Sequence, residues 1–195
     1  MHITKSKVSS VAYLPKVIHL RKLILPENHI NQFPDLTNAS STLIELDLFD
    51  NGLEYIHSFP QLAKLQQIYL NKNNLVEFPD LSNTGSILFR LELDVNNIKL
   101  VPEALIASLV SLTYLDLGEN PLVFLPQLSY INNTIELLLS EGNMSCDWHA
   151  SFIKTLETHG KVILSGDVSQ CNVPGLITCA NWSDLIVVDL VNETG

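Results

Sequence analysis

A template of leucines followed by one asparagine recurs through about two thirds of this 195-residue chain. Five stretches share the pattern L-x-L-x-x-N-x-L and a sixth keeps little beyond the asparagine: 23–30, 46–53, 68–75, 91–98, 115–122 and 138–145. An apolar residue precedes each template by three positions, so six registers start at residues 20, 43, 65, 88, 112 and 135. A period of 22–24 residues predicts stacked units, because one unit cannot bury its own leucines whereas neighbours share a continuous core.

The full pattern, L-x-x-L-x-L-x-x-N-x-L, resembles the leucine-rich repeat. The resemblance implies an α/β solenoid shaped as a horseshoe, with a parallel β-sheet on its concave face and loops and short turns on its convex face. The return segments 33–42 and 78–87 are nearly identical and proline-pinned, which predicts irregular or turn-like backbone. The segment 102–111 predicts a short helix or 3₁₀ turn with Pro102 at its first position.

The recurring asparagine stands where the chain leaves each strand and turns. Backbone groups have no ladder partner there, and a buried unpaired polar group costs about 1–3 kcal/mol. An amide side chain both donates and accepts hydrogen bonds, so we expect it to bond its own turn and the neighbouring repeat. This structural asparagine ladder comprises Asn28, Asn51, Asn73, Asn96, Asn120 and Asn143.

Residues 1–19 align with 46–64 after a shift of 45 positions, and Ser6 then takes the place of the asparagine. We interpret 1–19 as a truncated first repeat. A fragment of a longer chain explains the missing polar cap and the missing signal peptide, and a native start with a degenerate repeat is the alternative. In either case the strand edge at 23–25 lacks a complete neighbour, which favours dimerisation or fraying there.

The repeat ends after Asn143, and residues 143–195 have a different character. Residues 146–164 place apolar side chains at helical spacing, which predicts one helix ending near Gly160. The region resembles the cysteine-bearing C-terminal cap of extracellular leucine-rich-repeat proteins. Cys146 matches the first cysteine of that family, and Cys171, followed by Pro174, matches the third.

The cap departs from the family in its other cysteines. Trp148 replaces the second cysteine, no cysteine stands at the place of the fourth, and Cys179 is additional. The resemblance implies a Cys146–Cys171 disulfide, with Cys171–Cys179 as the competing bridge. Cys179 would otherwise stay free or pair with another chain, which offers a second route to a homodimer.

A cap of this kind implies an extracellular location, secreted or on the cell surface, because disulfides persist outside the cytosol. The sequence also contains N-x-S/T motifs, and Asn143 is excluded from them as a buried ladder residue. We expect glycosylation at Asn38, Asn132, Asn181 and Asn192. No run of 18 apolar residues occurs, so the sequence predicts no membrane insertion by this chain.

Composition argues against several classes of function. The chain has 21 acidic and 11 basic residues and a net charge of −10, which disfavours nucleic acid and anionic membrane surfaces as partners. We find no nucleophile-elbow, phosphate-loop, paired-cysteine or zinc-protease motif. The best metal-ligand pair, Cys146 with His149, is better explained as a cap cysteine beside a surface histidine. We therefore expect no catalytic residue, no cofactor, no metal site and no enzyme activity.

Function then rests on the strand positions that point away from the core. Acidic and aromatic side chains alternate there in neighbouring repeats, as in surfaces that bind proteins or peptides. The predicted ligand-binding residues are Asp47, Phe49, Tyr69, Arg90, Glu92, Tyr114 and Asp116. The acidic row predicts a basic ligand. The alternative is a solvated strand face that tolerates any polar residue. Leu137 and Leu139 are predicted on the same face or, alternatively, under the cap.

These observations favour an extracellular leucine-rich-repeat module that binds a protein ligand. The resemblance implies a receptor, adhesion or innate-recognition ectodomain. Two alternatives remain open: a structural matrix protein without a soluble ligand, and an intracellular scaffold with reduced cysteines.

Overall fold

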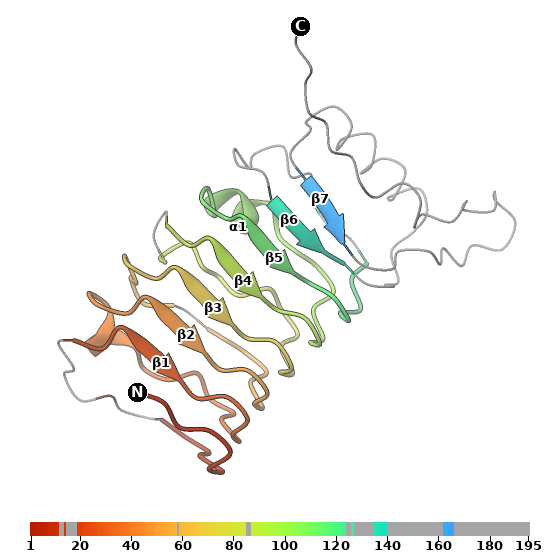
Figure 1. The fold of residues 1–195 in the computed structure, drawn as a ribbon. Coiled ribbons are helices and arrows are strands. Elements are labelled where there is room, and N and C mark those ends of the chain that lie inside the picture. Colours follow the sequence, from red (N-terminus) through yellow and green to blue (C-terminus); the bar gives the residue numbers. More distant parts are fainter. Residues whose placement is uncertain are drawn as a thin grey trace, which may run out of the picture.

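The computed structural model describes residues 1–11, 14, 19–57, 59–84, 87–123, 126 and 135–139, together with the backbone of 162–165. In this part of the chain, seven short strands form one parallel sheet in sequence order (Figure 1). They are β1 (Lys22–Ile24), β2 (Glu45–Asp47), β3 (Gln67–Tyr69), β4 (Arg90–Glu92), β5 (Tyr114–Asp116), β6 (Ile135–Leu138) and β7 (Val162–Ser165). The predicted fold class, a solenoid with a parallel sheet and turn-rich return segments, is confirmed.

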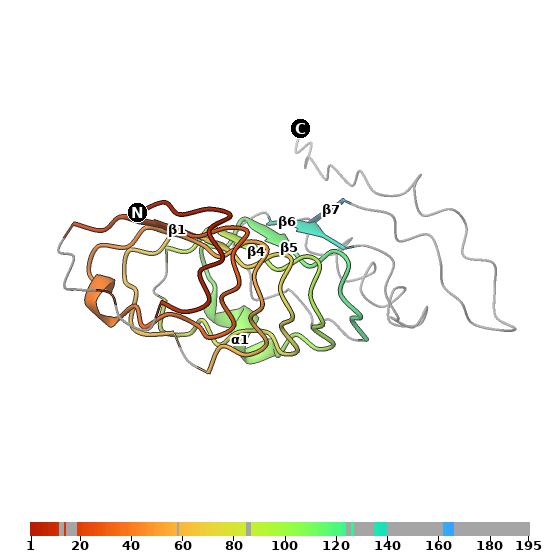
Figure 2. The ribbon, with the colours of Figure 1, turned by 90° about the horizontal axis from the view of Figure 1, so that it is seen from below.

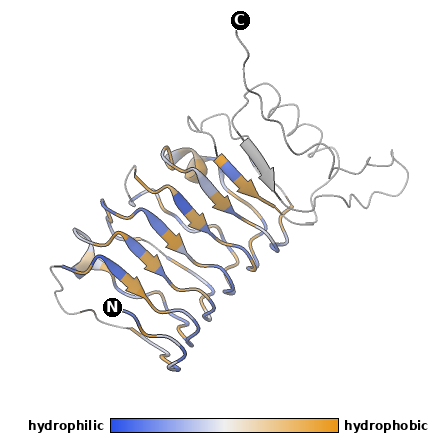
Figure 3. Ribbon diagram, in the orientation of Figure 1, coloured by the Kyte–Doolittle hydropathy of each residue, from blue (hydrophilic) through white to orange (hydrophobic). Residues whose placement is uncertain are grey.

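The core runs the length of the solenoid. The middle residue of each strand from β1 to β5 pairs with its counterpart in the next strand, and Leu137 continues this row in β6. All six of these side chains are completely buried: Leu23, Leu46, Ile68, Leu91, Leu115 and Leu137. Burying one leucine contributes about 1.5–3 kcal/mol, so each repeat is stabilised by the layer it shares with its neighbours. Hydrophilic and hydrophobic residues both occur within the short strands (Figure 3).

The return segments lie across the core from the sheet (Figure 2). The 3₁₀ helix η1 (Thr37–Ala39) and the helix α1 (Glu103–Ser108) belong to them. The predicted short helix after Pro102 is confirmed, although Pro102 has an extended ψ of 130° and is the N-cap residue rather than the first helical one. No helix among the described residues has the length and apolar composition needed to cross a membrane.

Each ladder asparagine in the described part of the chain makes the same set of bonds. Asn96 donates from Nδ2 to the carbonyl oxygens of Leu93 in its own turn and Leu70 in the preceding repeat, at 2.9 and 3.0 Å. Its Oδ1 accepts a hydrogen bond from the Leu75 amide at 2.9 Å. Asn28, Asn51, Asn73 and Asn120 repeat this arrangement. Asn143 lies outside the described residues.

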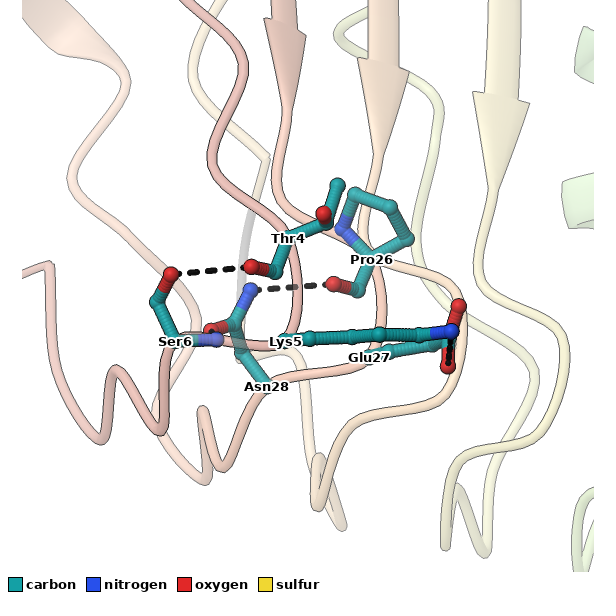
Figure 4. A network of polar contacts seen from close by, with 6 residues as sticks. All are labelled: Thr4, Lys5, Ser6, Pro26, Glu27 and Asn28. Carbon is teal, nitrogen blue, oxygen red and sulfur yellow. Dashed lines mark hydrogen bonds and ion pairs between the residues drawn. The ribbon is translucent and has the colours of Figure 1, made fainter.

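The turn before each ladder asparagine requires a left-handed backbone. The residue at this position has a φ of 50–54° in every one of these turns that the structure describes: Lys5, Glu27, Asp50, Lys72, Val95 and Glu119. Figure 4 shows the first two of these turns, where the Lys5 ammonium lies 3.2 Å from the Glu27 carboxylate. In the first turn, Ser6 stands where the later repeats have asparagine, and its hydroxyl donates to the Thr4 carbonyl.

The N-terminal residues cover the outer edge of β1, which the sequence predicted to lack a complete neighbour. The Ile24 amide donates to the Met1 carbonyl, and the Ile3 amide donates to the Ile24 carbonyl, both at 2.9 Å. His2 lies beside Ile24 in the register that a shift of 45 residues implies. Residues 1–3 thus give β1 a partial neighbour through one bridge and these hydrogen bonds, so its outer edge is partly covered rather than fully unpaired.

The sixth repeat differs from its predicted register by one residue. Leu137, not Leu138, pairs with Leu115, and both Leu137 and Leu139 are buried in the core cluster. Their predicted placement on the exposed face is wrong. Because side chains alternate along a strand, a slip of one residue exchanges the two faces. Glu136 is exposed instead, and Leu138 is half-buried.

Candidate functional site

Two rows of side chains point away from the core across β1–β6, and we call this surface the strand face. One row contains Lys22, Glu45, Gln67, Arg90, Tyr114 and Glu136, and the other contains Ile24, Asp47, Tyr69, Glu92, Asp116 and Leu138. Every member is half-buried or exposed. Adjacent strands lie about 4.8 Å apart, so the predicted residues Asp47, Tyr69, Glu92 and Asp116 form one continuous stripe. Phe49 follows the end of β2.

Arg90 occupies the centre of the strand face between two tyrosines. Its guanidinium carbon lies 3.7 Å from the ring centroid of Tyr114 and 5.9 Å from that of Tyr69. The same guanidinium binds Glu92, with Nη2 and Nε at 2.6 and 2.8 Å from Oε1. This ion pair compensates the charge of Glu92, so the predicted acidic row is interrupted at its middle. What remains at the centre is a Tyr–Arg–Tyr stack that presents flat aromatic area.

Asp47 and Asp116 occupy the same position two and one strands away from this centre. Each Oδ1 accepts a hydrogen bond at 2.9 Å from the backbone amide two residues later, that of Phe49 or Gly118. Burial raises the pKa of both carboxyl groups above the ordinary value, and the charge of Glu92 raises it further. The hydrogen bonds to Phe49 and Gly118 oppose this shift. The two carboxylates are thus held in fixed orientations in a poorly solvated environment.

Asp94 adds a third carboxylate that the sequence analysis did not select. It follows β4 by two residues, in the column that also contains Phe49 and Asn71. Among the described residues, Asp94 Oδ1 and Asn71 Oδ1 are both buried and lack a hydrogen-bond partner. Burial, together with the charge of Asp116, raises the pKa of Asp94 to about 6. The sequence could have shown this residue, because Asp94 and Asn71 take equivalent positions in adjacent repeats.

Glu136 is the second residue that the sequence analysis missed, since the wrong register put Leu137 in its place. It is exposed beside Tyr114, whose pKa is raised by burial first and then by the charges of Asp116 and Glu136. At the other end of the sheet, Lys22 and Glu45 form an ion pair. No described lysine or arginine forms an ion pair with Asp94, Asp116 or Glu136. In the part of the chain that the structure describes, carboxylates without an ion-pair partner therefore gather over β4–β6.

Phe49 lies outside the stack around Arg90. The Lys72 ammonium lies 5.2 Å from the centroid of its ring, at the ends of β2 and β3. Phe49 thus belongs to a separate cation–π pair at the margin of the strand face. Six of the seven predicted ligand-binding residues lie in the two rows of the strand face, and the seventh, Phe49, lies at the margin of these rows.

The predicted modification sites are away from the strand face or outside the described residues. Asn38 belongs to η1 and is half-buried, and its Nδ2 donates to the Leu14 carbonyl at 2.8 Å. A glycan on Nδ2 would have to coexist with this bond. Asn132, Asn181, Asn192, Cys146, Cys171 and Cys179 lie outside the described residues, as does the cap helix. No cluster of three metal-ligating side chains occurs within the described ranges.

No protein-family model and no curated protein matches the sequence. Solved structures share the fold. A leucine-rich-repeat protein of Leptospira interrogans is 25% identical with a TM-score of 0.62, over 74% of this chain and 36% of that chain. The functional domain of InlJ from Listeria monocytogenes, which includes a cysteine ladder, is 22% identical with a TM-score of 0.60, over 76% and 30% of the two chains.

Internalin C2 from Listeria monocytogenes is 23% identical with a TM-score of 0.56, and the match covers 74% of this chain and 70% of that chain. The present chain spans about a third of the length of the Leptospira protein and of the InlJ domain. The comparisons and the repeat geometry agree on the class: the chain has the leucine-rich-repeat fold.

Proposed function

We propose that this chain is a non-enzymatic binding module that holds a basic protein or peptide on its strand face. The observation that carries the proposal is the Tyr69–Arg90–Tyr114 stack, bordered by the carboxylates of Asp94 and Asp116, which form no ion pair within the described residues. Arg90 lies at the centre of the stack and is already paired with Glu92. Leucine-rich-repeat folds are suited to protein binding, which supports the same class of function.

The chemistry of the strand face favours this kind of ligand. Rigid aromatic side chains supply contact area at low conformational cost, and they dominate the binding energy of many interfaces. Half-buried carboxylates with raised pKa values are poorly solvated and repel each other, and this repulsion does not stabilise the fold. A partner lysine or arginine would relieve that repulsion and steer the encounter. We therefore assign Tyr69 and Tyr114 as anchors, and Asp47, Asp94, Asp116 and Glu136 as the charged border.

We also propose an extracellular setting, in a receptor, adhesion or innate-recognition ectodomain. The cysteine-bearing cap and the N-x-S/T motifs support it. Peptide mapping of the untreated secreted chain, without reduction, tests both features at once. A peptide linking Cys146 to Cys171 and glycans at Asn132, Asn181 or Asn192 are expected. A bridge between Cys171 and Cys179 would contradict the proposed pairing, and three free thiols without glycans would contradict the location.

In the binding experiment, the chain serves as bait to capture a protein from its native extracellular fluid. Interferometry then measures the association and dissociation rates of the captured protein. We expect affinity to fall with added salt, mainly through slower association, because exposed charges are screened. Asp116→Asn should slow association. Tyr69→Ala should speed dissociation and cost about 2 kcal/mol, the usual loss at an aromatic anchor.

Glu103→Gln is the matched control, since this exposed glutamate lies in α1 on a return segment away from the strand face. It should change neither rate constant. A ligand whose affinity ignores salt, Asp116→Asn and Tyr69→Ala would refute the assignment of the strand face.

A further inference from the structure

A second surface lies on the return segments of the first four described repeats. Two adjacent hollows of about 680 and 560 Å³ share Tyr55 and His57 as lining residues. The rings of Tyr55 and His57 are nearly parallel, with centroids 6.3 Å apart, where the two hollows share their lining. None of the described residues in the two rows of the strand face lines either hollow. The surface is therefore separate from the site described above.

The second hollow is lined by apolar side chains that are exposed to solvent. Leu100, Tyr55 and Val76 are 54%, 50% and 38% exposed, and α1 contributes Leu105 beside them. Single exposed apolar residues are ordinary on protein surfaces, but a contiguous apolar group in a hollow marks an interaction site. These four side chains come from three consecutive repeats and from a helix, so they form one patch across several return segments.

Carboxylates border both hollows. Asp35 and Glu54 line the first hollow, Glu77 and Asp80 line the second, and Lys99 is the single lysine or arginine among the described lining residues. None of the four carboxylates forms an ion pair within the described part of the chain. Hydrogen bonds from Thr37 and Ser82 lower the pKa of Asp35 and Asp80, so both stay ionised. Negative charge thus lies on either side of Tyr55.

We propose that the two hollows form a docking groove for a peptide segment of a partner protein. The segment would place an aromatic or aliphatic anchor against Tyr55, Val76 and Leu100, and lysine or arginine residues on both sides of that anchor. The charge pattern selects this occupant, because an apolar centre with acidic ends complements an apolar anchor with basic ends. The groove goes beyond the proposed function, since it engages a different partner segment on a different face.

The test selects random peptides displayed on phage against the immobilised chain, and measures the affinity of the enriched peptides by calorimetry. We expect peptides that have an apolar residue between basic residues. Their affinity should fall about tenfold or more in Tyr55→Ser and in Leu100→Ser, and similarly in Glu77→Lys, whose side chain reverses the charge. Tyr55→Phe should retain most of the affinity, because the ring is kept.

Tyr69→Ala is the control, because it alters the strand face and leaves the groove intact. Enriched peptides that are neutral or acidic, or whose affinity ignores Tyr55→Ser and Leu100→Ser, would overturn the proposal. Peptides that lose affinity only in Tyr69→Ala would support the strand face and overturn the groove. Self-association of the chain that is lost in Tyr55→Ser would make a second copy the occupant, and would also overturn it.

Discussion

Asp94 shows how one side chain of the strand face opposes folding at neutral pH. Its pKa is about 6 in the folded chain against an ordinary value of 3.8. A group whose pKa rises on folding contributes stability below its unfolded pKa, and that contribution is lost as pH rises through the folded pKa. The window for Asp94 is thus about pH 4 to 6. At pH 7 this half-buried carboxylate is ionised, and its buried Oδ1 has no hydrogen-bond partner among the described residues, so it destabilises the fold.

Asp94→Asn should therefore raise the free energy of unfolding at pH 7. We expect a gain of about 1 kcal/mol, after allowance for solvent screening of a half-exposed group. The gain should vanish near pH 4, where Asp94 is protonated in the folded chain, and denaturant titrations at the two pH values measure it. Asp80→Asn is the contrast, because the Ser82 hydrogen bonds lower the pKa of Asp80. A gain of the same size at both pH values would contradict the assignment to ionisation.

Val95 carries backbone strain. Its φ of 54° lies in the left-handed region, where a β-branched side chain is an outlier. The other described repeats place Lys, Glu or Asp at this position, and a left-handed conformation costs about 1–2 kcal/mol for ordinary residues. Asparagine tolerates the conformation better, so Val95→Asn should raise the free energy of unfolding by about 1 kcal/mol. Val76→Asn, at a position outside the left-handed region, should give no such gain in the same denaturant titration.

The asparagine ladder stabilises the turn that follows each strand. Asn96 is buried and connects its own turn to the repeat before it through hydrogen bonds to Leu70, Leu75 and Leu93. Asn96→Ala leaves these backbone groups unsatisfied, and each buried unpaired group costs about 1–3 kcal/mol. We expect a loss of about 3 kcal/mol in the free energy of unfolding. Asn97→Ala, at the exposed neighbouring asparagine, should change the free energy of unfolding little. Thermal unfolding of the two variants measures the difference.

The positions of the strands could be predicted from the sequence because the repeat template that marks them is local. In β2, β4 and β5 the template alternates leucine with polar residues, which fixes the buried face and the register together. The sixth repeat reads I-E-L-L-L, and three successive leucines fit two registers equally well. The pairing of Leu137 with Leu115 decides between the two registers, and these two residues are 22 positions apart in the sequence. Glu136 was missed for this reason.

The sequence predicted which residues lie on the strand face better than it predicted how their charges interact. Parallel pairing of equivalent positions follows from the repeat, so Asp47, Tyr69 and Glu92 were expected in one row, as the register has them. The compensation of Glu92 by Arg90 depends on side-chain conformations, which no repeat pattern encodes. The two hollows beside Tyr55 could not be predicted from the sequence, because their walls come from four return segments, including residues of η1 and α1.

The whole molecule is a stack in which each described strand pairs only with its neighbours in sequence. In such a quasi-one-dimensional array, stability is a sum of repeat and nearest-neighbour interface terms. Loss of packing at one end should therefore fray that end. Loss of packing in the middle should uncouple the two halves. Leu23 in β1 and Leu91 in β4 are a matched pair, because both are completely buried in the same row.

Leu23→Ala and Leu91→Ala each remove a buried side chain, at a cost of about 2–5 kcal/mol. Hydrogen exchange read by mass spectrometry should separate their consequences. In Leu23→Ala, protection should fall at the amides of Ile3 and Ile24 but persist at the Leu93 amide, which donates to Asp116 in the next repeat. In Leu91→Ala, protection should fall on both sides of β4, including the Leu48 amide. An equal loss at every amide in both variants would show a single cooperative unit, and would refute the nearest-neighbour account of this solenoid.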